Sequence, residues 1–301
     1  LRRMPGLSEE EMASGEITRF GAKEITDFTW KQLLDFDACT NCGRCQDQCP
    51  AHNSGKVLSP RKLIQDLRAY QTLRAPVLLA TPEGEEPPPP DLDMLGFVDR
   101  NAVWSCTTCR ACMEACPVFI EHIDSIVDMR RYMVLEESDV QETAMNALQS
   151  MEQRGHPWRG TAFTRSDWYQ GTEVKVLGES APEDPKVEVL LWVGCTPALE
   201  ERSQGMAKAA VSVLKRAGIN FGILGTEETC TGDPARRMGN EYLYMVLAQQ
   251  NIETFKKYGV EKIVTICPHC FNTIKNECPQ FGGEFEVMHL TEFVNELIQK
   301  G

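Results

Sequence analysis

The sequence predicts a multidomain α+β protein, in which an all-helical domain precedes an α/β domain with a mainly parallel sheet. Three observations predict this architecture. Two cysteine-rich runs in the first half are flanked by apolar residues at helical spacing. A stretch rich in Gly, Pro and charge, residues 155–186, indicates a connector. Beyond it, β-branched apolar runs alternate with helical patterns, as in an α/β layer. We therefore expect an N-terminal arm (1–36), a helical domain (37–154), the connector and an α/β domain (187–301).

The composition limits the partners of this chain. Its 301 residues include 31 Lys and Arg against 44 Asp and Glu, a formal charge of −13. The acidic balance disfavours nucleic acids and anionic membrane surfaces, because phosphate contacts need clustered Lys and Arg. No apolar run approaches the roughly 18 residues that span a bilayer, so we expect the chain as given to be soluble. It begins at Leu1 rather than Met, and we expect a trimmed piece of a longer protein.

Thirteen cysteines are the unusual feature of the composition. An odd number in an acidic chain without a signal segment favours metal ligation in a reducing compartment over a disulfide framework. Eight of them form two runs with the spacing C-x2-C-x2-C-x3-C-P, which start at Cys39 and Cys106. This spacing binds [4Fe–4S] clusters in two-cluster bacterial ferredoxins. Structural zinc also takes four thiolates, usually from two separated C-x2-C pairs, and is the alternative.

The spacing also indicates which thiolates share a cluster. Three cysteines two residues apart can each reach a different iron of one cube, whereas the fourth starts the next helix and points away. In a paired arrangement the fourth cysteine therefore ligates the other cluster. We assign the two cubes to Cys39, Cys42, Cys45 and Cys116, and to Cys106, Cys109, Cys112 and Cys49.

The segments around the cysteine runs carry helix signals. Ser59 and Pro60 fit an N-cap and a first helical position ahead of an apolar stripe. Ser138 and Gln141 fit a capping box of a later helix. The second cysteine run, which ends in Cys116-Pro117-Val118, is similar to the second cluster run of the heterodisulfide reductase and succinate dehydrogenase iron–sulfur subunits, and residues 36–131 resemble their all-helical ferredoxin domain.

The α/β half has four predicted strands, at residues 187–193, 219–224, 260–266 and 285–289. Helical patterns lie between and after them, at 207–216, 237–258, 271–277 and 292–299. In the connector, Trp158, Trp168 and Tyr169 are expected to serve packing rather than function, because large aromatic side chains mostly serve burial.

The remaining cysteines follow these strands. Cys195 comes after the first strand, Cys230 after the second, and Cys267 and Cys270 after the third. The carboxyl ends of parallel strands meet at one edge, where ligands of open α/β folds bind, so we expect the four thiols to converge. Helix N-termini at that edge can donate N–H groups to sulfur. Burial as small apolar side chains is the alternative for isolated cysteines.

This half resembles the cysteine-rich domain of heterodisulfide reductase-type and glycolate oxidase-type iron–sulfur proteins, often called the CCG domain. The matching residues are Cys195, Cys230-Thr231-Gly232 and Cys267-Pro268-His269-Cys270. Thr231 stands where the family has the second of two adjacent cysteines, so we do not carry over its five-thiolate non-cubane cluster. We expect one ordinary [4Fe–4S] cube on the four thiolates, and we regard Cys278 as a spare thiol.

No catalytic residue is assigned from the sequence. His269 lies in the chelating loop and His289 at the fourth strand end, where either could relay protons. A lone histidine is more often a hydrogen-bonded structural residue. Arg236 and Arg237 either balance cluster charge and receive a partner, or form a solvated, salt-bridged helix start.

The sequence has no G-x-G-x-x-G, Walker, H-E-x-x-H or G-x-S-x-G motif, so a partner or a missing segment must oxidise the donor. We expect an iron–sulfur electron-transfer oxidoreductase. The stretches at Gly21–Trp30, Asp37–Cys45 and Thr229–Arg237 are similar to those of bacterial membrane-anchored proteins of the heterodisulfide reductase type. That resemblance implies a flavoprotein donor such as electron-transfer flavoprotein, a membrane quinone acceptor, and a place at the cytoplasmic face of the membrane in a larger protein or complex. The alternatives are a disulfide reductase, the iron–sulfur subunit of a lactate or glycolate dehydrogenase, and a zinc-organised interaction module.

Overall fold

The structure, a computed structural model, describes residues 1, 2, 4, 20–158, 163–179 and 186–300. Its contacts divide the chain into two compact units, Leu1–Val140 with Arg237–Gly239, and Gln141–Arg236 with Asn240–Gly301. Parts of the expected arm and connector, at residues 5–19, 159–162 and 180–185, lie outside the described residues. The sequence-based domain limits, including the one after residue 154, stay predictions.

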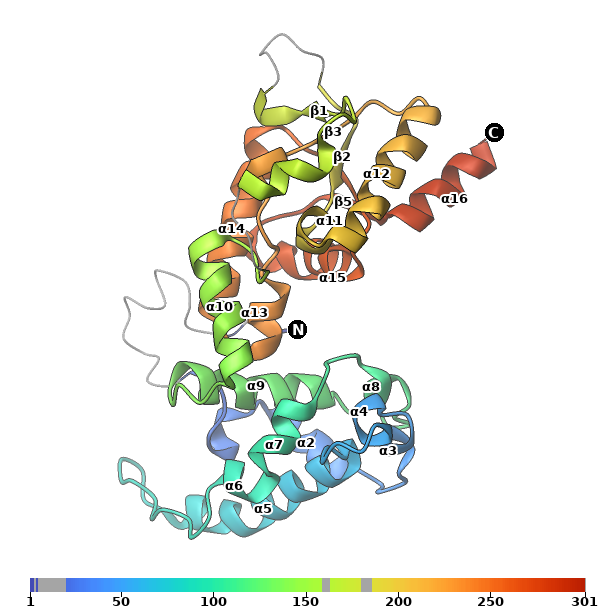
Figure 1. Cartoon of the computed structure of the whole chain (residues 1–301). Helices are drawn as coiled ribbons and strands as arrows, with labels where there is room; N and C mark the ends of the chain where they lie inside the picture. The colour runs from blue at the N-terminus through green and yellow to red at the C-terminus, as the bar shows by residue number, and fades with distance from the viewer. Residues whose placement is uncertain (3, 5–19, 159–162, 180–185, 301) are drawn as a thin grey trace. The chain divides into compact units, whose positions relative to one another are not determined.

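The first unit is helical in the part that the structure describes (Figure 1). Its elements are η1 (Ile25–Asp27), α2 (Trp30–Ala38), α3 (Arg44–Asp47), α4 (Pro50–Asn53), α5 (Pro60–Ala80), α6 (Met94–Val98), α7 (Arg100–Ser105), α8 (Ala111–Glu114) and α9 (His122–Leu135). Helix α5 begins as predicted, with Pro60 in its first turn and the Ser59 hydroxyl accepting the Lys62 backbone N–H at 3.1 Å.

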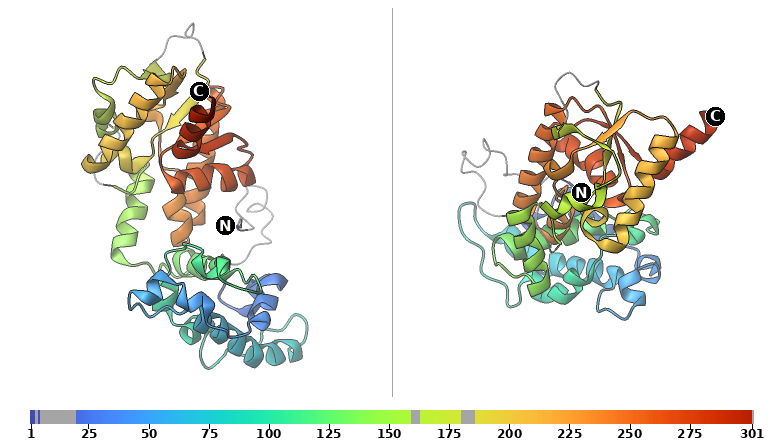
Figure 2. Two further views of the ribbon diagram at one scale, coloured as in Figure 1. Left: turned by 90° about the vertical axis from the view of Figure 1, so that its right-hand side faces the viewer. Right: turned by 45° about the horizontal axis from the view of Figure 1, so that its top comes forward.

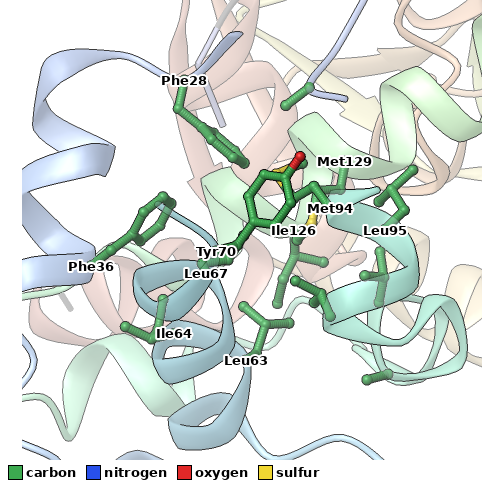
Figure 3. Packing of buried hydrophobic residues seen from close by; sticks show 14 of the residues in the cluster. Phe28, Phe36, Leu63, Ile64, Leu67, Tyr70, Met94, Leu95, Ile126 and Met129 are labelled. Atoms are coloured by element: carbon green, nitrogen blue, oxygen red, sulfur yellow. The ribbon is translucent and has the colours of Figure 1, made fainter. Parts of the chain in front are cut away.

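One buried core holds these helices together. Apolar side chains from one face of α5 point toward those of α6, α9 and the segment around α2 (Figure 3). The labelled members are Phe28, Phe36, Leu63, Ile64, Leu67, Tyr70, Met94, Leu95, Ile126 and Met129. Cys49 and Cys116, the fourth cysteines of the two runs, belong to the same buried cluster. The core therefore fixes one end of each cysteine run.

The second unit contains a five-stranded parallel sheet with the order β1-β3-β2-β4-β5. The strands are β1 (Lys175–Val176), β2 (Val189–Trp192), β3 (Phe221–Ile223), β4 (Lys262–Thr265) and β5 (Glu286–His289). The helices and turns are α10 (Glu142–Arg154), η2 (Phe163–Tyr169), η3 (Leu177–Glu179), α11 (Cys195–Leu199), α12 (Glu201–Arg216), η4 (Gly225–Glu227), α13 (Asp233–Met238), α14 (Glu241–Lys257), α15 (Pro268–Asn272), a π-helical turn (Thr273–Glu277), η6 (Cys278–Phe281) and α16 (Leu290–Lys300). The predicted parallel sheet is thus present, with β1 as a strand that the sequence did not indicate.

Helices cover both faces of this sheet. In the strand β2, Leu191 packs with α12 and α16 on one face, whereas Leu190 and Trp192 pack with α14 and α15 on the other. The alternation is the two-residue period of a strand. Figure 1 shows α12 and α14 on opposite sides of the strands, and Figure 2 shows the sheet between its helices from two further directions. A sheet covered on both faces leaves its carboxyl edge free for ligands.

The connector supplies part of this core. Trp168 and Tyr169 lie in η2, and both side chains are buried in the cluster on the α12 face. Their rings meet edge to face with centroids 5.5 Å apart. Trp168 and Tyr169 pack as the sequence indicated. For Trp158 the packing prediction was wrong, because this side chain is 42% exposed and its ring N–H donates to the Thr196 hydroxyl at 3.2 Å.

Two local predictions were wrong. The helical pattern at residues 237–258 is broken at Gly239, which adopts φ 96°, and Asn240 caps a new helix by accepting the Leu243 N–H at 3.0 Å. The capping box at Ser138 does not form, because Ser138 has φ 54° in the turn after α9. Helix α10 starts instead after Gln141, without a side-chain cap.

Arg236 was also misread as a possible solvated helix start. Its side chain is fully buried and pairs with Glu241 at 2.9 Å and with Glu277 at 2.8 Å. The guanidinium also lies over the Tyr244 ring, 4.5 Å from its centroid. Arg236 therefore joins α13, α14 and the π-helical turn through buried charge.

None of the helices in the described part of the chain is long and apolar enough to cross a membrane.

We expect Arg236→Met to lower the free energy of unfolding by about 3–5 kcal/mol, because it leaves two buried carboxylates without a countercharge. The matched control is Arg216→Met in the exposed last turn of α12, which should change it by no more than about 0.5 kcal/mol. Urea unfolding under anaerobic conditions, followed by circular dichroism, measures both variants. Equal effects of the two substitutions would contradict the role given to Arg236.

Candidate metal centres

The two cysteine runs of the first unit share one backbone design. Asn41 and Thr108, between the first and second cysteines, have φ 56° and 54°, and Gly43 and Arg110, between the second and third, have φ 87° and 67°. Each pair of left-handed residues is followed by a short helix, α3 or α8. Left-handed φ is costly for a β-branched residue such as Thr108, so the surrounding fold must impose it. The repeated turns fold each C-x2-C-x2-C segment around one space.

The first group of thiols lines a pocket. Cys39, Cys42 and Cys45 come from the first run, and Cys116 from the second. Its wall also includes His122, whose Nδ1 lies 3.0 Å from the carbonyl oxygen of Ile120. Burial lowers the pKa of His122 to about 4, so this part of the wall is uncharged at neutral pH.

The second group of thiols contains the first three cysteines of the second run. Burial, and after it the neighbouring thiols of Cys106, Cys109, Cys45 and Cys49, raise the pKa of Cys112 to about 12. Burial, and after it the neighbouring thiols of Cys109 and Cys49, also raise the pKa of Cys106, so Cys49 lies near the first three cysteines of the second run. Cys45 and Cys112 also share a buried apolar cluster, so the two groups of thiols adjoin.

Ionising several of these thiols at once is unfavourable in free energy. Burial and then the neighbouring Cys39 thiol raise the pKa of Cys45 to about 11. Cys42 and Cys109, at the same place in the two runs, are exposed. The backbone N–H of Arg44 lowers the pKa of Cys42. Binding of a cation offsets the cost of buried thiolates, because a coordinated thiol loses its proton outright.

Backbone N–H groups and one buried arginine support the second run. The Thr108 N–H donates to Cys106 Sγ at 3.3 Å, and the Ile120 N–H donates to Cys116 Sγ at 3.4 Å. Arg130, 4% exposed, donates to the carbonyl oxygens of Val103 at 2.7 Å and Cys106 at 2.6 Å. The sequence reasoning missed Arg130. Its signal was a charged residue within the apolar stripe of α9.

The third group lies at the carboxyl edge of the sheet in the second unit. Cys195 is the first residue of α11, directly after β2 and Gly194. Cys267 caps α15 after β4. Gly194 has φ 84°, and a Cβ there would lie 3.4 Å from Cys267 Cβ and 3.5 Å from Cys270 Sγ. The turns after β2 and β4 therefore approach each other as closely as their side chains allow.

Four thiols meet at this edge. A hydrogen bond from Cys230 lowers the pKa of Cys195, and one from Cys270 lowers the pKa of Cys267. The donors Cys230 and Cys270 have raised pKa values for the same reason and because they are buried. Cys195 and Cys230 also raise the pKa of Cys270, so the two pairs act on each other. The structure thus brings together the four cysteines that the strand pattern indicated.

Thr231 and Cys278 take different places around this group. Thr231 is 2% exposed, and its hydroxyl donates to Cys270 Sγ at 3.9 Å. It therefore contacts the group as a hydrogen-bond donor. The Cys278 thiol is buried beside Glu277 and Arg236, and burial raises its pKa to about 12.

The two candidate histidines lie beside the third group. His269 hydrogen-bonds to Cys267 and lowers the pKa of that thiol. His289 ends β5, with Nδ1 2.8 Å from the Thr291 hydroxyl and Nε2 3.3 Å from the Ile266 carbonyl oxygen. Both ring nitrogens of His289 are thus engaged, which favours a structural role.

The donor set fits iron–sulfur clusters. Among the residues that the structure describes, no group of three or more His, Cys, Asp or Glu side chains is arranged around a single metal ion. A zinc ion would draw its four thiolates to about 2.3 Å from one centre. A cube holds its thiolates farther apart, because each binds a different iron. Soft thiolate donors, N–H groups aimed at sulfur and burial all suit such a cluster.

Two family descriptions match the chain. Residues 38–120 match the 4Fe-4S dicluster domain, and residues 189–275 match the cysteine-rich domain named CCG. These two segments contain the twelve cysteines of the three groups.

Several relatives extend over almost the whole chain. It is 44% identical over 304 residues, 95% of its length, to the EtfAB:quinone oxidoreductase of Syntrophomonas wolfei. It is 40% identical over 312 residues, 94% of its length, to the probable iron-sulfur-binding oxidoreductase FadF of Bacillus subtilis. It is 28% identical over 285 residues, 92% of its length, to one of the subunits of the dihydromethanophenazine:CoB–CoM heterodisulfide reductase of Methanosarcina barkeri.

The chain spans 43% and 44% of the first two relatives and 66% of the third. Its two domains occur in the order that the sequence predicted, and its cofactors are [4Fe–4S] clusters. The chain thus contains a 4Fe-4S dicluster domain followed by a cysteine-rich domain, and over nearly its whole length it is similar to iron–sulfur oxidoreductases of the heterodisulfide reductase type.

Proposed function

We propose that this chain relays electrons through three [4Fe–4S] cubes. The observation that carries the proposal is the convergence of twelve thiols in three groups of four. The proposed ligands are Cys39, Cys42, Cys45 and Cys116 for the first cube, Cys106, Cys109, Cys112 and Cys49 for the second, and Cys195, Cys230, Cys267 and Cys270 for the third. Such clusters accept and release single electrons, and burial and N–H to sulfur bonds set their potentials.

The first two groups suit a relay because they adjoin. Cys45 of one group and Cys112 of the other are buried in the same apolar cluster, with Ile123 and Val127. Apolar packing around both groups excludes water. The exposed Cys42 and Cys109 mark where each group comes nearest to solvent. An electron can therefore enter at a surface thiolate and pass inward through ligands that share one buried cluster.

The third group favours electron transfer over disulfide chemistry. A fifth thiolate would be needed for the unusual cluster of the resembled family, and Thr231 supplies a hydroxyl instead. One [4Fe–4S] cube takes four thiolate ligands. His289 is engaged at both ring nitrogens, and His269 hydrogen-bonds to Cys267.

A flavoprotein donor and a membrane quinone acceptor are the partners that we propose. The name of the Syntrophomonas wolfei relative, an EtfAB:quinone oxidoreductase, supports both. Another relative is named as a probable membrane-anchored ferredoxin, which supports a place at the membrane. We propose the cytoplasmic face and a docking partner with a basic patch, because this chain carries a charge of −13.

A catalytic disulfide reductase is the second candidate. The relative from Methanosarcina barkeri belongs to a heterodisulfide reductase, and this favours it. Disulfide reductase activity of the unmodified protein would reverse the assignment of the third group to electron transfer alone. An iron–sulfur subunit of a lactate or glycolate dehydrogenase would differ only in its flavoprotein.

Iron and sulfide analysis of the anaerobically purified chain tests the three cubes. We expect about twelve irons per chain, four for each cube, and three reducible signals in electron paramagnetic resonance. About eight irons would leave the third group without its cube, and a colourless protein with zinc would end the proposal.

The crossed ligand assignment has its own test. Cys116→Ser should alter the spectrum of the cube held by Cys39, Cys42 and Cys45, whereas Cys49→Ser should alter that of the other cube. Each variant replaces the thiol by a hydroxyl of similar size, so the fold is disturbed as little as possible. Cys278→Ser is the matched control, and its spectrum should equal that of the unmodified chain. An effect of each substitution on its own run's cube would contradict the crossing.

Thr231→Cys tests the role of the third group. If the four thiolates hold an ordinary cube, a fifth nearby thiol has no iron left to bind, so we expect the spectrum of that cube to be unchanged. Thr231→Ser, which keeps the hydroxyl, is the control. A new spectral form in Thr231→Cys would show that the group rearranges toward a five-thiolate cluster.

The acidic surface predicts salt-sensitive docking. We expect the rate at which reduced electron-transfer flavoprotein reduces this chain to fall roughly tenfold between low and high salt, because screening weakens charge steering. Stopped-flow absorbance at several ionic strengths measures the rate. A rate independent of salt would remove the basic docking patch from the proposal.

A further inference from the structure

A buried ion pair lies directly behind the third group of thiols. Arg165, in η2, and Glu228, which follows η4, are 3% and 4% exposed. Arg165 Nη2 pairs with Glu228 Oε1 at 2.5 Å. Glu228 lies two residues before Cys230, and η2 packs against α11, which begins at Cys195. The pair therefore touches the elements that carry two of the four thiols.

Glu228 holds the turn that leads into Cys195. Its carboxylate accepts the N–H of Val193 at 3.1 Å and the N–H of Gly194 at 2.7 Å. These groups end β2 and would otherwise be buried donors without an acceptor, which is costly. One carboxylate thus fixes the end of the strand and, through its own position in the chain, the approach to Cys230.

Arg165 has more donor capacity than Glu228 uses. Its Nη1 is buried and has no hydrogen-bond partner in the part of the chain that the structure describes. A guanidinium stays charged and offers five N–H donors, so a buried nitrogen without a partner among the described residues calls for an acceptor, and the sulfur atoms of a bound cluster can supply one. The charge of Arg165 also lowers the pKa values of Cys195 and Cys230, which places it within electrostatic reach of both thiols.

We propose that Arg165, held by Glu228, is a positioning residue of the third cluster site, which supplies fixed positive charge and a hydrogen-bond donor to the sulfur-rich group there. This inference rests on the third cube of the proposed function. Reduction adds one electron, taken from the reduced flavoprotein or from a chemical reductant, and no bond in the protein forms or breaks. A fixed positive charge stabilises the more negative reduced state, so it raises the reduction potential. Glu228 acts in the opposite sense, because its charge is negative.

The two members of the pair give opposite predictions, and this makes the test sharp. Arg165→Met should disfavour reduction of the third cube about tenfold, which is 59 mV for a one-electron couple. Arg165→Lys retains the charge and should shift the potential less. Glu228→Gln keeps an acceptor oxygen for the strand end, loses the negative charge and should shift the potential upward. Arg216→Met, an exposed arginine in the same unit, is the control and should shift nothing.

The measurement is a redox titration of the anaerobic chain followed by electron paramagnetic resonance, with iron counted in every variant. Full iron content with an unchanged potential in Arg165→Met would overturn the inference alone. Shifts of the same sign in Arg165→Met and Glu228→Gln would also overturn it. If Arg165→Met loses iron, Arg165→Lys and Glu228→Gln replace it in the test. An unchanged potential in Glu228→Gln, or shifts of the same sign in these two variants, would then overturn the inference. About eight irons in the unmodified chain would instead overturn the third cube, and the inference with it.

Discussion

The repulsion between buried thiolates is the constraint on which the rest of this structure depends. Two unit charges 4 Å apart interact by about 4 kcal/mol even at an effective dielectric constant of 20, and each group holds four cysteines. The raised pKa values of Cys45, Cys112 and Cys270 express this cost, because burial and neighbouring thiols oppose ionisation together. Only a bound cation relieves it. The fold is therefore arranged to hold four sulfur atoms around a space and to supply N–H donors and positive charge nearby, and metal binding and folding must be coupled.

The two units bring their thiols together in different ways. In the first unit the chain turns locally, through left-handed residues such as Gly43 and Arg110, and a short stretch delivers three thiols at once. The fourth thiol comes from the other run and is anchored in the helical core. In the second unit no local turn brings the cysteines together. The parallel sheet does, because the ends of β2 and β4 are neighbours at one edge, and Gly194 supplies the positive φ, 84°, of the turn into Cys195. The local turns of the first unit allow each cysteine run to be short. The third group, at a sheet edge, instead depends on the stability of the whole second unit.

How much of this could be predicted from the sequence follows from the range of the interactions. The Ser59 cap and the four longer strands depend on neighbouring residues, and they were found to within a few residues. The domain matches agree with the two cysteine patterns as well. The break at Gly239 was missed because a helical apolar period continues across it, and the two residues of β1 carry too little pattern to indicate a strand. The buried partners of Arg236, and the roles of Arg130 and Arg165, join residues far apart in the chain. No spacing rule reveals which charged side chain will be buried.

At position 231 a single side chain bears on whether the third group transfers electrons or cleaves a disulfide. The family that the second unit resembles has a cysteine at this position, directly after the residue that matches Cys230. The Thr231 hydroxyl has the same place but donates a hydrogen bond to Cys270, so it stabilises a thiolate without competing for iron. A donor in place of a ligand leaves four thiolates, which saturate a cube, and a saturated cube has no open position for a substrate. It still exchanges electrons, because electron transfer needs proximity and a matched potential and does not need a vacant coordination site. Thr231 in place of a cysteine therefore favours electron transfer over bond cleavage at the third group.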